Sequence, residues 1–493
     1  MPLWTNRYNG PANSFDWTQA VAVDESGNAF VAGQSYDHTN YFYTTIKYSA
    51  AGVPLWTNRY NGNGHTNNIL KAMAVDGNGN VFVTGYCDMG TSSDYVMVAY
   101  SNAGLPLWTN HYLSPFITGV PADLVSGTHG NVFTTSSDFS TFAISTAGVL
   151  LWTNKFQEPG RYCRAAKLAV DTNGNVFVTG YSAHSDPSIC DFATVAYSVT
   201  GVPLWTNYFN ETGTHNCQSR AIAVDRGGNV FVTGFFGALF PATSGFATIK
   251  YSGAGVPLWT NHFGGGYNVQ ISSAGLAVDA GENLLVTGSS YNGSSYDYTT
   301  IKYSGEGLPL WTNFYTASGS YSNHQPVAVA VDGSGNVFVT GNTTFINGTG
   351  SAYRTVAYSA AGVLLWAHFY KNKISVGDDY AVGLAADRNG NVFVTGYSNS
   401  TQSGDGDPDF ITIKYSGITA TPATLTQATA ADGQFGFTFG VNSNRAYSVE
   451  FVDFLTSSNW LTLTNIDAQT TATNIAVTNA MTNNARFYRV RTP

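Results

Sequence analysis

The chain has few charged residues and no long apolar segment, and each shortage excludes a class of protein. Asp, Glu, Lys and Arg make up only 10% of the 493 residues, and the net charge at pH 7 is −9. A weakly charged, net acidic chain does not suit nucleic acid or an anionic membrane as a partner. No apolar run reaches the length that a transmembrane helix needs, and no cleavable signal peptide is visible.

What the chain has instead is a repeated fragment, Pro-Leu-Trp-Thr-Asn. Its tryptophan recurs at spacings of 52, 52, 44, 53, 54, 52 and 55 residues, at Trp4, Trp56, Trp108, Trp152, Trp205, Trp259, Trp311 and Trp366. A period near 50 made of strand-like pieces is typical of a radial array of four-stranded sheets, since one such unit cannot bury both its faces alone. The sequence therefore predicts an all-β fold.

One repeat unit, residues 71–112, shows how the strands are expected to run. Alternating β-branched and aromatic residues between Gly/Asn turns predict strands at 72–76, 80–85, 94–100 and 107–112. The first strand of each unit carries small residues, whereas the fourth carries Trp with Tyr or Phe. Because strands near a central axis have the least room, this gradient places the first strand at the axis and the fourth at the rim.

An aspartate ends the first strand of most units. It stands three residues before a glycine at Asp24, Asp76, Asp171, Asp225, Asp332 and Asp387, and Asp279 precedes a glycine shifted to Gly281. This spacing suits a type I turn whose backbone N–H groups the carboxylate accepts. The stretch from Asp76 to Asn80 also looks like a calcium loop, but its place between two strands favours the structural role.

The repeated motifs resemble the bacterial β-propeller repeat family called SBBP. They read Ala-Val-Asp-x-x-Gly-Asn-Val-Phe-Val-Thr-Gly, then Asp-x-x-Thr-Ile-Lys-Tyr-Ser, then Gly-Val-Pro-Leu-Trp-Thr-Asn, and cover residues 1 to about 417. The resemblance implies a propeller from a largely extracellular group of proteins and supplies no catalytic residues. The family is described as seven-bladed, whereas eight units are counted in this chain.

The two ends of the repeat region predict how the ring closes. Residues 2–8 are a lone fourth strand, and the last unit ends at Gly417 without one. We therefore expect the N-terminal strand to complete the last unit and close an eight-bladed propeller over residues 1–417. Residues 418–424 are interpreted as a linker. Residues 425–493 predict a small β-sandwich-like domain, similar to modules of exported bacterial proteins, with strands at 434–441, 447–454, 460–464, 474–477 and 486–491.

The turns of such units alternate between the two faces of the disc. The Asp-x-x-Gly and Ala-Gly-Val-Pro turns share one face, which we call the constant face because they hardly change between units. The remaining loops share the other face and differ in every unit, so we call it the variable face. Since loops on a rigid frame usually carry binding sites, we expect the site on the variable face.

All four cysteines are expected on the variable face. Three of them come from two neighbouring units together with two histidines: Cys163, Cys190, Cys217, His184 and His215. This group is interpreted either as a metal site or as one loop disulfide with spare thiols. The absence of a tight C-x-x-C spacing favours the disulfide. Cys87 lies two units away and is expected not to pair with the other three.

A group of carboxylates gathers in the eighth unit: Asp378, Asp379, Asp405, Asp407 and Asp409. Hard oxygen ligands at this density are compatible with Ca²⁺, although the spacing of an EF-hand is missing. The alternative is a solvated acidic loop. The sequence requires no cofactor. Ca²⁺ is the one candidate ligand ion that it suggests.

Aromatic residues are frequent in the variable loops. Those selected as ligand contacts are Trp17, Tyr36, Tyr162, Phe236, Tyr267, Tyr321 and Tyr380. Flat rings beside polar side chains suit sugar recognition, since a ring stacks on the pyranose while polar groups bond its hydroxyls. The alternative is that these rings cover the interfaces between units.

Enzyme signatures are missing from the sequence. It contains no G-x-S-x-G, H-E-x-x-H or phosphate-binding loop, and Glu158 and Glu211 are the only glutamates expected on the variable face. We therefore expect a non-catalytic binding or scaffold protein, secreted or at the cell surface, with a glycan or a protein as ligand. One alternative is a polysaccharide lyase or glycoside hydrolase with an axial site, and another is a purely structural cell-surface protein.

Overall fold

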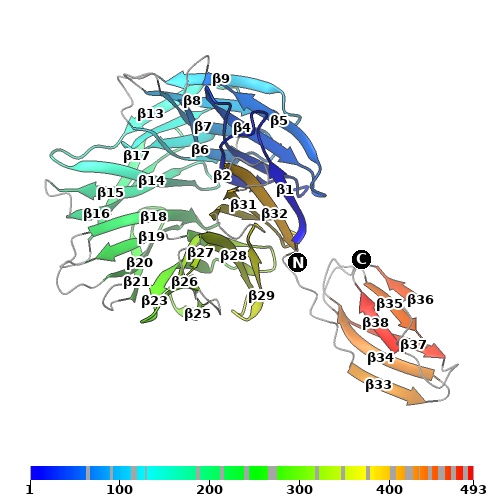
Figure 1. The fold of residues 1–493 in the computed structure, drawn as a ribbon. Helices are drawn as coiled ribbons and strands as arrows, with labels where there is room; N and C mark the ends of the chain where they lie inside the picture. The colour runs from blue at the N-terminus through cyan, green and yellow to red at the C-terminus, as the bar shows by residue number, and fades with distance from the viewer. Residues whose placement is uncertain are drawn as a thin grey trace. The chain divides into compact units, whose positions relative to one another are not determined.

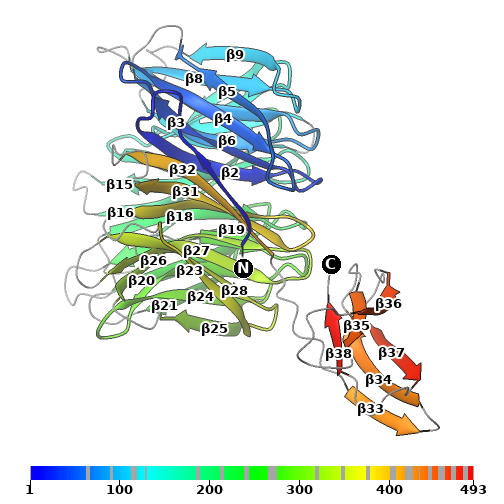
Figure 2. The same cartoon turned by 45° about the vertical axis from the view of Figure 1, so that its right-hand side comes forward.

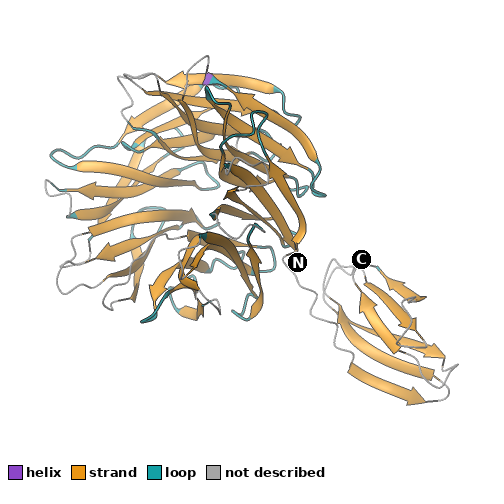
Figure 3. Ribbon diagram, in the orientation of Figure 1, coloured by secondary structure: helices purple, strands orange, loops and turns teal. Residues whose placement is uncertain are grey.

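The structure is a computed structural model, in which the chain divides into two compact units, Met1–Gly417 and Ile418–Pro493. The structure describes residues 2–62, 67–88, 93–112, 119–127, 130–184, 189–210, 216–237, 244–264, 275–316, 321–345, 350–372, 378–399, 407–416, 426–431, 434–441, 447–452, 461–467, 473–480 and 487–491. Within these ranges the elements are β-strands joined by turns, without an α-helix; the short helical piece in Figure 3 is a 3₁₀ turn at Gly62.

The described residues of the first compact unit form thirty-two strands. In the first half of the ring they are β2 (Asp16–Val23), β3 (Ala29–Tyr36), β4 (Tyr41–Tyr48), β5 (Pro54–Tyr60), β6 (Asn67–Val75), β7 (Val81–Asp88), β8 (Ser93–Tyr100), β9 (Pro106–Tyr112), β10 (Pro121–Ser126), β11 (Val132–Ser136), β12 (Ser140–Ile144), β13 (Leu150–Lys155), β14 (Tyr162–Val170), β15 (Val176–Ala183), β16 (Cys190–Tyr197) and β17 (Pro203–Phe209). In the second half they are β18 (Asn216–Val224), β19 (Val230–Gly237), β20 (Ser244–Tyr251), β21 (Pro257–Gly264), β22 (Gly275–Val278), β23 (Leu284–Tyr291), β24 (Tyr296–Tyr303), β25 (Pro309–Tyr315), β26 (Tyr321–Val331), β27 (Val337–Phe345), β28 (Ser351–Tyr358), β29 (Leu364–Tyr370), β30 (Asp379–Ala386), β31 (Asn391–Asn399), β32 (Pro408–Ser416) and the N-terminal β1 (Pro2–Tyr8).

These strands pair as antiparallel four-stranded units in chain order, from β2–β5 (unit 1) to β26–β29 (unit 7). Units 6 and 7 are joined into one sheet by a single parallel bridge between Tyr296 and Asn323. Unit 8 has the order β1-β32-β31-β30, so the N-terminal strand completes it as the sequence predicts.

The units are arranged as a closed ring. Their first strands touch one another in the cyclic order β2, β6, β10, β14, β18, β22, β26, β30 and back to β2. Figure 1 shows the units radiating around a centre that the first strands surround. The predicted propeller is thus the observed fold, and the number eight rests on this strand pairing and cyclic order.

The first strands are interrupted by a β-bulge at matching places. In seven units one residue is skipped in the pairing with the second strand, and these residues are Gln19, Lys71, Ala122, Ala166, Arg220, Val327 and Val382. A bulge bends the strand and redirects the side chain that it carries. Every first strand with a bulge therefore has a segment before it, on the variable side, and a segment after it that ends at the constant face.

The aspartate turns of the constant face are closed by their own hydrogen bonds. Asp76 Oδ1 accepts the N–H groups of Asn78 and Asn80 at 2.9 and 2.8 Å, and its Oδ2 accepts the Asn80 amide at 2.9 Å. The structural role predicted for this turn is confirmed, because its oxygens are occupied by the turn itself. The fourth position has a positive φ, as at Gly79 (78°), but in unit 6 it is held by Glu282 (62°).

Neighbouring units are also joined on the constant face. Trp205 Nε1 donates to the Gly253 carbonyl at 2.9 Å, and the Asn207 amide donates to the Gly255 carbonyl at 2.7 Å. The same two bonds recur from Trp4 and Asn6 through Trp311 and Asn313. The Thr-Asn of the repeated fragment therefore has a structural reason: its asparagine ties one unit to the next turn.

The hydrophobic core lies between units rather than in one central mass. One cluster combines Phe30 and Tyr43 of unit 1 with Val81 and Val96 of unit 2, all at most 1% exposed. Each sheet thus buries both faces only because a neighbour covers it, as expected for a radial repeat. The variable face is held on a rigid frame by this packing.

The described part of the second compact unit consists of two three-stranded sheets. Its strands are β33 (Thr426–Ala431), β34 (Gln434–Val441), β35 (Tyr447–Val452), β36 (Leu461–Ile466), β37 (Thr473–Ala480) and β38 (Phe487–Arg491). They pair in the orders β33-β34-β37 and β36-β35-β38 (Figure 2). Phe437, Phe439 and Val449 are at most 2% exposed and form its core with Tyr447 and Val477. The sequence anticipated five of these strands and missed β33.

Candidate functional site

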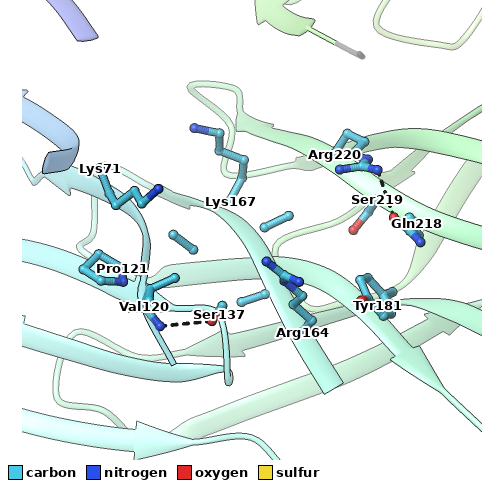
Figure 4. Close-up of a pocket in the computed structure, with 13 residues that line it drawn as sticks. Lys71, Val120, Pro121, Ser137, Arg164, Lys167, Tyr181, Gln218, Ser219 and Arg220 are labelled. Atoms are coloured by element: carbon cyan, nitrogen blue, oxygen red, sulfur yellow. Dashed lines mark hydrogen bonds between the residues drawn. The ribbon is translucent and has the colours of Figure 1, made fainter. Parts of the chain in front are cut away.

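A cavity of about 600 Å³ opens where the first strands of units 2 to 5 begin (Figure 4). Its lining comes from β6, β10, β14 and β18, from Val120 just before β10, and from the adjoining Ser137 and Tyr181. The first strands enter the ring from the variable face, so the cavity belongs to that face. We call it the axial pocket.

Four basic side chains line the axial pocket and no acidic one does: Lys71, Arg164, Lys167 and Arg220. All four are exposed. Lys167 Nζ lies 3.0 Å from Asp123 Oδ1, whereas no ion pair joins Lys71, Arg164 or Arg220 to a carboxylate among the residues that the structure describes. Partial burial of its side chain lowers the pKa of Arg220, and the charge of Arg164 acts in the same direction. The pocket is therefore a local excess of positive charge in a chain of net charge −9.

The bulges explain how these cations reach one place. Lys71 and Arg220 are the bulge residues of β6 and β18, while β14 has the small Ala166 there, flanked by Arg164 and Lys167. This site was not predicted from the sequence, because a bulge breaks the alternation by which strands are recognised. The signal was present in the spacing: Lys71 and Arg220 each stand five residues before the turn aspartate of their unit, Asp76 and Asp225.

Two of the predicted aromatic contacts do lie together. Trp17 and Tyr36 form a cluster with Phe15 and Tyr41, with ring centroids 5.3 Å apart for Phe15–Trp17, 6.0 Å for Trp17–Tyr41 and 4.6 Å for Tyr36–Tyr41. Phe15 is exposed and the other three rings are half-buried. This unit 1 aromatic cluster presents ring surface on the variable face.

The other selected aromatics are dispersed. Tyr162 is 61% exposed, and its ring lies 6.4 Å from that of Tyr181 in the axial pocket. Phe236 is 7% exposed and packs edge-on against His262, and the Tyr380 ring lies 5.5 Å from the Tyr397 ring. Tyr267 and the side chain of Tyr321 lie outside the described residues.

The predicted disulfide is not formed, because none of the four cysteines is bonded to another. Cys190 Sγ instead lies against the backbone of Cys217, at 3.1 Å from both its carbonyl oxygen and its nitrogen. Burial raises the pKa of the Cys190 thiol to about 11, so it stays protonated at neutral pH. Cys163 Sγ lies 3.6 Å from Ser182 Oγ.

The histidines of that group do not complete a metal site in the described part of the chain. His184 contacts the Arg161 guanidinium, and His215 lies outside the described residues. Among the side chains that are described, no three His, Cys, Asp or Glu residues gather as ligands.

The carboxylates of unit 8 have partners of their own. Asp379 is buried, accepts the Asn372 N–H at 3.0 Å and lies 3.4 Å from Lys371 Nζ. Asp409 pairs with the Arg7 guanidinium, and Asp378 accepts the Ser351 N–H at 3.0 Å. Asp407 directly precedes β32, and Asp405 lies outside the described residues. Calcium binding by this group stays a prediction.

The glutamate that an enzyme would need takes part in a polar network outside the pocket lining. Glu158 accepts the Ser182 hydroxyl at 2.8 Å and lies 3.4 Å from Arg161, which also lies 2.7 Å from Asp191. Glu211 lies outside the described residues. The described side chains therefore place cations, not a pair of carboxylates, in the axial pocket.

Comparison with known proteins supports the repeat and the fold. Residues 164–186 and 375–402 match the family model described as SBBP, beta-propeller repeat. Sqt1 from Chaetomium thermophilum superposes with a TM-score of 0.52 at 12% identity, covering 83% of this chain and 97% of Sqt1. The Dos1 propeller gives a TM-score of 0.50 at 10% identity, covering 83% and 94%. No curated protein sequence matches this chain. At these identities the likeness concerns the fold alone.

The described residues include no helix with the length and apolarity to cross a membrane.

Proposed function

We propose that this β-propeller with SBBP repeats is a non-catalytic binding or scaffold module, secreted or at the cell surface, which holds a glycan or protein ligand on its variable face. The axial pocket carries this proposal. It is a concave site where side chains of several units converge, and its volume lies within the range of about 300–1,000 Å³ that is usual for ligand sites.

The contrast between the two faces supports the same proposal. The constant face is occupied by bonds that the units need for their own assembly, such as those of Trp205 and Asn207. The variable face presents both the axial pocket and the unit 1 aromatic cluster. Rigid frames with diverse loops on one side are the usual setting of binding sites.

The proposal is tested by measuring binding and catalysis on the same ligands. The full-length protein is applied to a glycan array, and every polysaccharide that binds is then incubated with it in an assay for released reducing sugar. Binding without release is expected. Release that is lost on substituting Glu158 or Asp378 would instead indicate a lyase or hydrolase.

A variant with an altered pocket locates the binding. Ala166→Trp places a large ring at the bulge of β14, where the native residue is small and lines the pocket. Gly227→Trp in the exposed turn after β18 is the matched control on the constant face. Loss of binding in the control alone would contradict the proposal.

A further inference from the structure

We propose that the axial pocket binds the acidic units of an anionic polysaccharide, through carboxylate or sulfate groups on the sugar. This inference rests on the proposed function, because it names the ligand class of the same pocket. It is carried by the juxtaposition of Lys71, Arg164, Lys167 and Arg220 around one cavity without a lining carboxylate.

The arrangement of charges in the axial pocket suits a bound anion. Arg164 and Arg220 come from adjacent first strands, and the charge of Arg164 adds to the lowering of the pKa of Arg220. Only Lys167 has a carboxylate near it, Asp123 at 3.0 Å, among the side chains that the structure describes. An anion in the pocket would receive charge-assisted hydrogen bonds from guanidinium forks, which match carboxylate and sulfate oxygens in pairs.

The remaining lining favours a sugar over an acidic peptide. Tyr181 adds a half-buried ring to the wall, and the exposed Tyr162 lies beside it. A ring next to cations suits a sugar that carries an acid, since its face stacks while its charged group is paired. Gln218 adds an amide that can bond hydroxyl groups. A cavity of about 600 Å³ admits one or two sugar units rather than a folded surface.

The experiment compares charged and neutral forms of the same polymers. Binding of the full-length protein is measured by biolayer interferometry to polygalacturonate and its methyl ester, to dextran sulfate and dextran, and to poly-L-glutamate. We expect binding to the carboxylated or sulfated polysaccharide and at least about tenfold weaker binding to its neutral form, since hydrogen bonds to charged groups are stronger than those to neutral ones.

A charge-matched pair of variants separates the pocket from general attraction. The double variant Arg164→Gln/Arg220→Gln removes two charges from the pocket. The variant Arg226→Gln/Arg388→Gln removes two from turns of the constant face, where both side chains are exposed. The two double variants therefore have the same net charge as each other. We expect the first to weaken binding at least about tenfold and the second to change it less than about twofold. Far-ultraviolet circular dichroism confirms that both variants are folded.

The outcomes distinguish failure of the acidic ligand from failure of the proposed binding function. Equal binding of neutral and charged polysaccharides, or equal loss in both double variants, overturns the acidic ligand while leaving a binding function. Binding of poly-L-glutamate alone overturns the saccharide and favours an acidic protein partner. No binding to any of these polymers, together with an empty glycan array, overturns the acidic ligand and removes glycans from the proposed function.

Discussion

Glu282 has a left-handed backbone conformation. In the other units a glycine occupies the same position. Its φ is 62°, whereas Gly228 and Gly335 at the same place have φ of 80°. A residue with a Cβ atom is strained there by about 1–2 kcal/mol. The side chain of Glu282 is exposed, so replacing it removes no core contact.

We therefore expect Glu282→Gly to raise the free energy of unfolding by about 0.5–1 kcal/mol, after the greater entropy of glycine in the unfolded chain is subtracted. Denaturant-induced unfolding measures the change. The reverse substitution Gly335→Glu serves as the control and should lower stability by a similar amount. A destabilised Glu282→Gly variant would show that the strain is absent.

Asp16 makes the stability of the ring dependent on pH. It is fully buried at the start of β2, where Oδ2 accepts the Gly10 N–H at 2.6 Å, and burial raises its pKa from 3.8 to about 7. Between these two values the unfolded chain loses a proton that the folded protein keeps. The contribution of Asp16 to stability therefore falls as pH rises from about 4 to 7, by up to about 4 kcal/mol.

The variant Asp16→Asn removes this titration. We expect its unfolding free energy, relative to that of the native protein, to increase from about pH 4 to about pH 7 and to stay level above that range. Urea unfolding at a series of pH values measures the difference. A difference that does not vary with pH would contradict a raised pKa at Asp16.

At the scale of the element, the asparagine of the repeated fragment is a joint between units. Asn207 donates to the Gly255 carbonyl at 2.7 Å across the interface. Removing the donor leaves that carbonyl without its amide partner, so Asn207→Ala should cost about 1–2 kcal/mol of stability. Thr206→Ala on the same strand is the control, because Thr206 is exposed. Equal effects of the two substitutions in thermal unfolding would argue against the joint.

The strands show where sequence reasoning succeeds and where it stops. Alternation and turn residues mark the second, third and fourth strands of unit 2, and their predicted ends lie within three residues of the observed ones. The first strand is predicted at 72–76 but runs from Asn67 to Val75. Its missing segment lies before the bulge at Lys71, where the pairing slips and the alternation ends. The axial pocket is lined by residues at and beside these bulges and so escaped prediction.

The seventh unit departs from the repeat for a reason that becomes clear only in three dimensions. It reads Trp366-Ala367-His368 where the other units have Trp-Thr-Asn. In every other unit the asparagine bonds the turn before the fourth strand of the next unit. Unit 8 does not reach its fourth strand through such a turn, since β32 ends at Ser416 and the fourth strand is the N-terminal β1. The loss of Asn in this one copy accompanies the loss of its acceptor.

At the scale of the whole molecule, the ring depends on strand β1. Its pairing with β32 joins Tyr8 to Phe410 and Thr5 to Ile413, and Arg7 meets the buried Asp409. Deleting residues 1–9 would expose the edge of β32 and leave the Asp409 carboxylate buried without its cation. An exposed strand edge is a template for association with other chains.

We expect the deletion to produce self-association and a clearly lower unfolding temperature, measured by light scattering after gel filtration and by calorimetry. Deletion of residues 418–493 is the control, because these residues form a compact unit of their own. A truncated protein that stays monomeric and unfolds at the native temperature would contradict the role of β1.

The closure of the ring by the N-terminal strand also has a consequence for biosynthesis. Arg7 and Asp409 are 402 residues apart in the chain. At synthesis rates of about 5–20 residues per second, β1 waits on the order of 20–80 seconds after its own synthesis for its partner β32. Earlier sheets can pack against their neighbours during that time. The pairing of β1 with β32 that closes the ring forms only when translation has passed residue 416. A nascent chain stalled before this point would present an unfinished circle to chaperones and proteases.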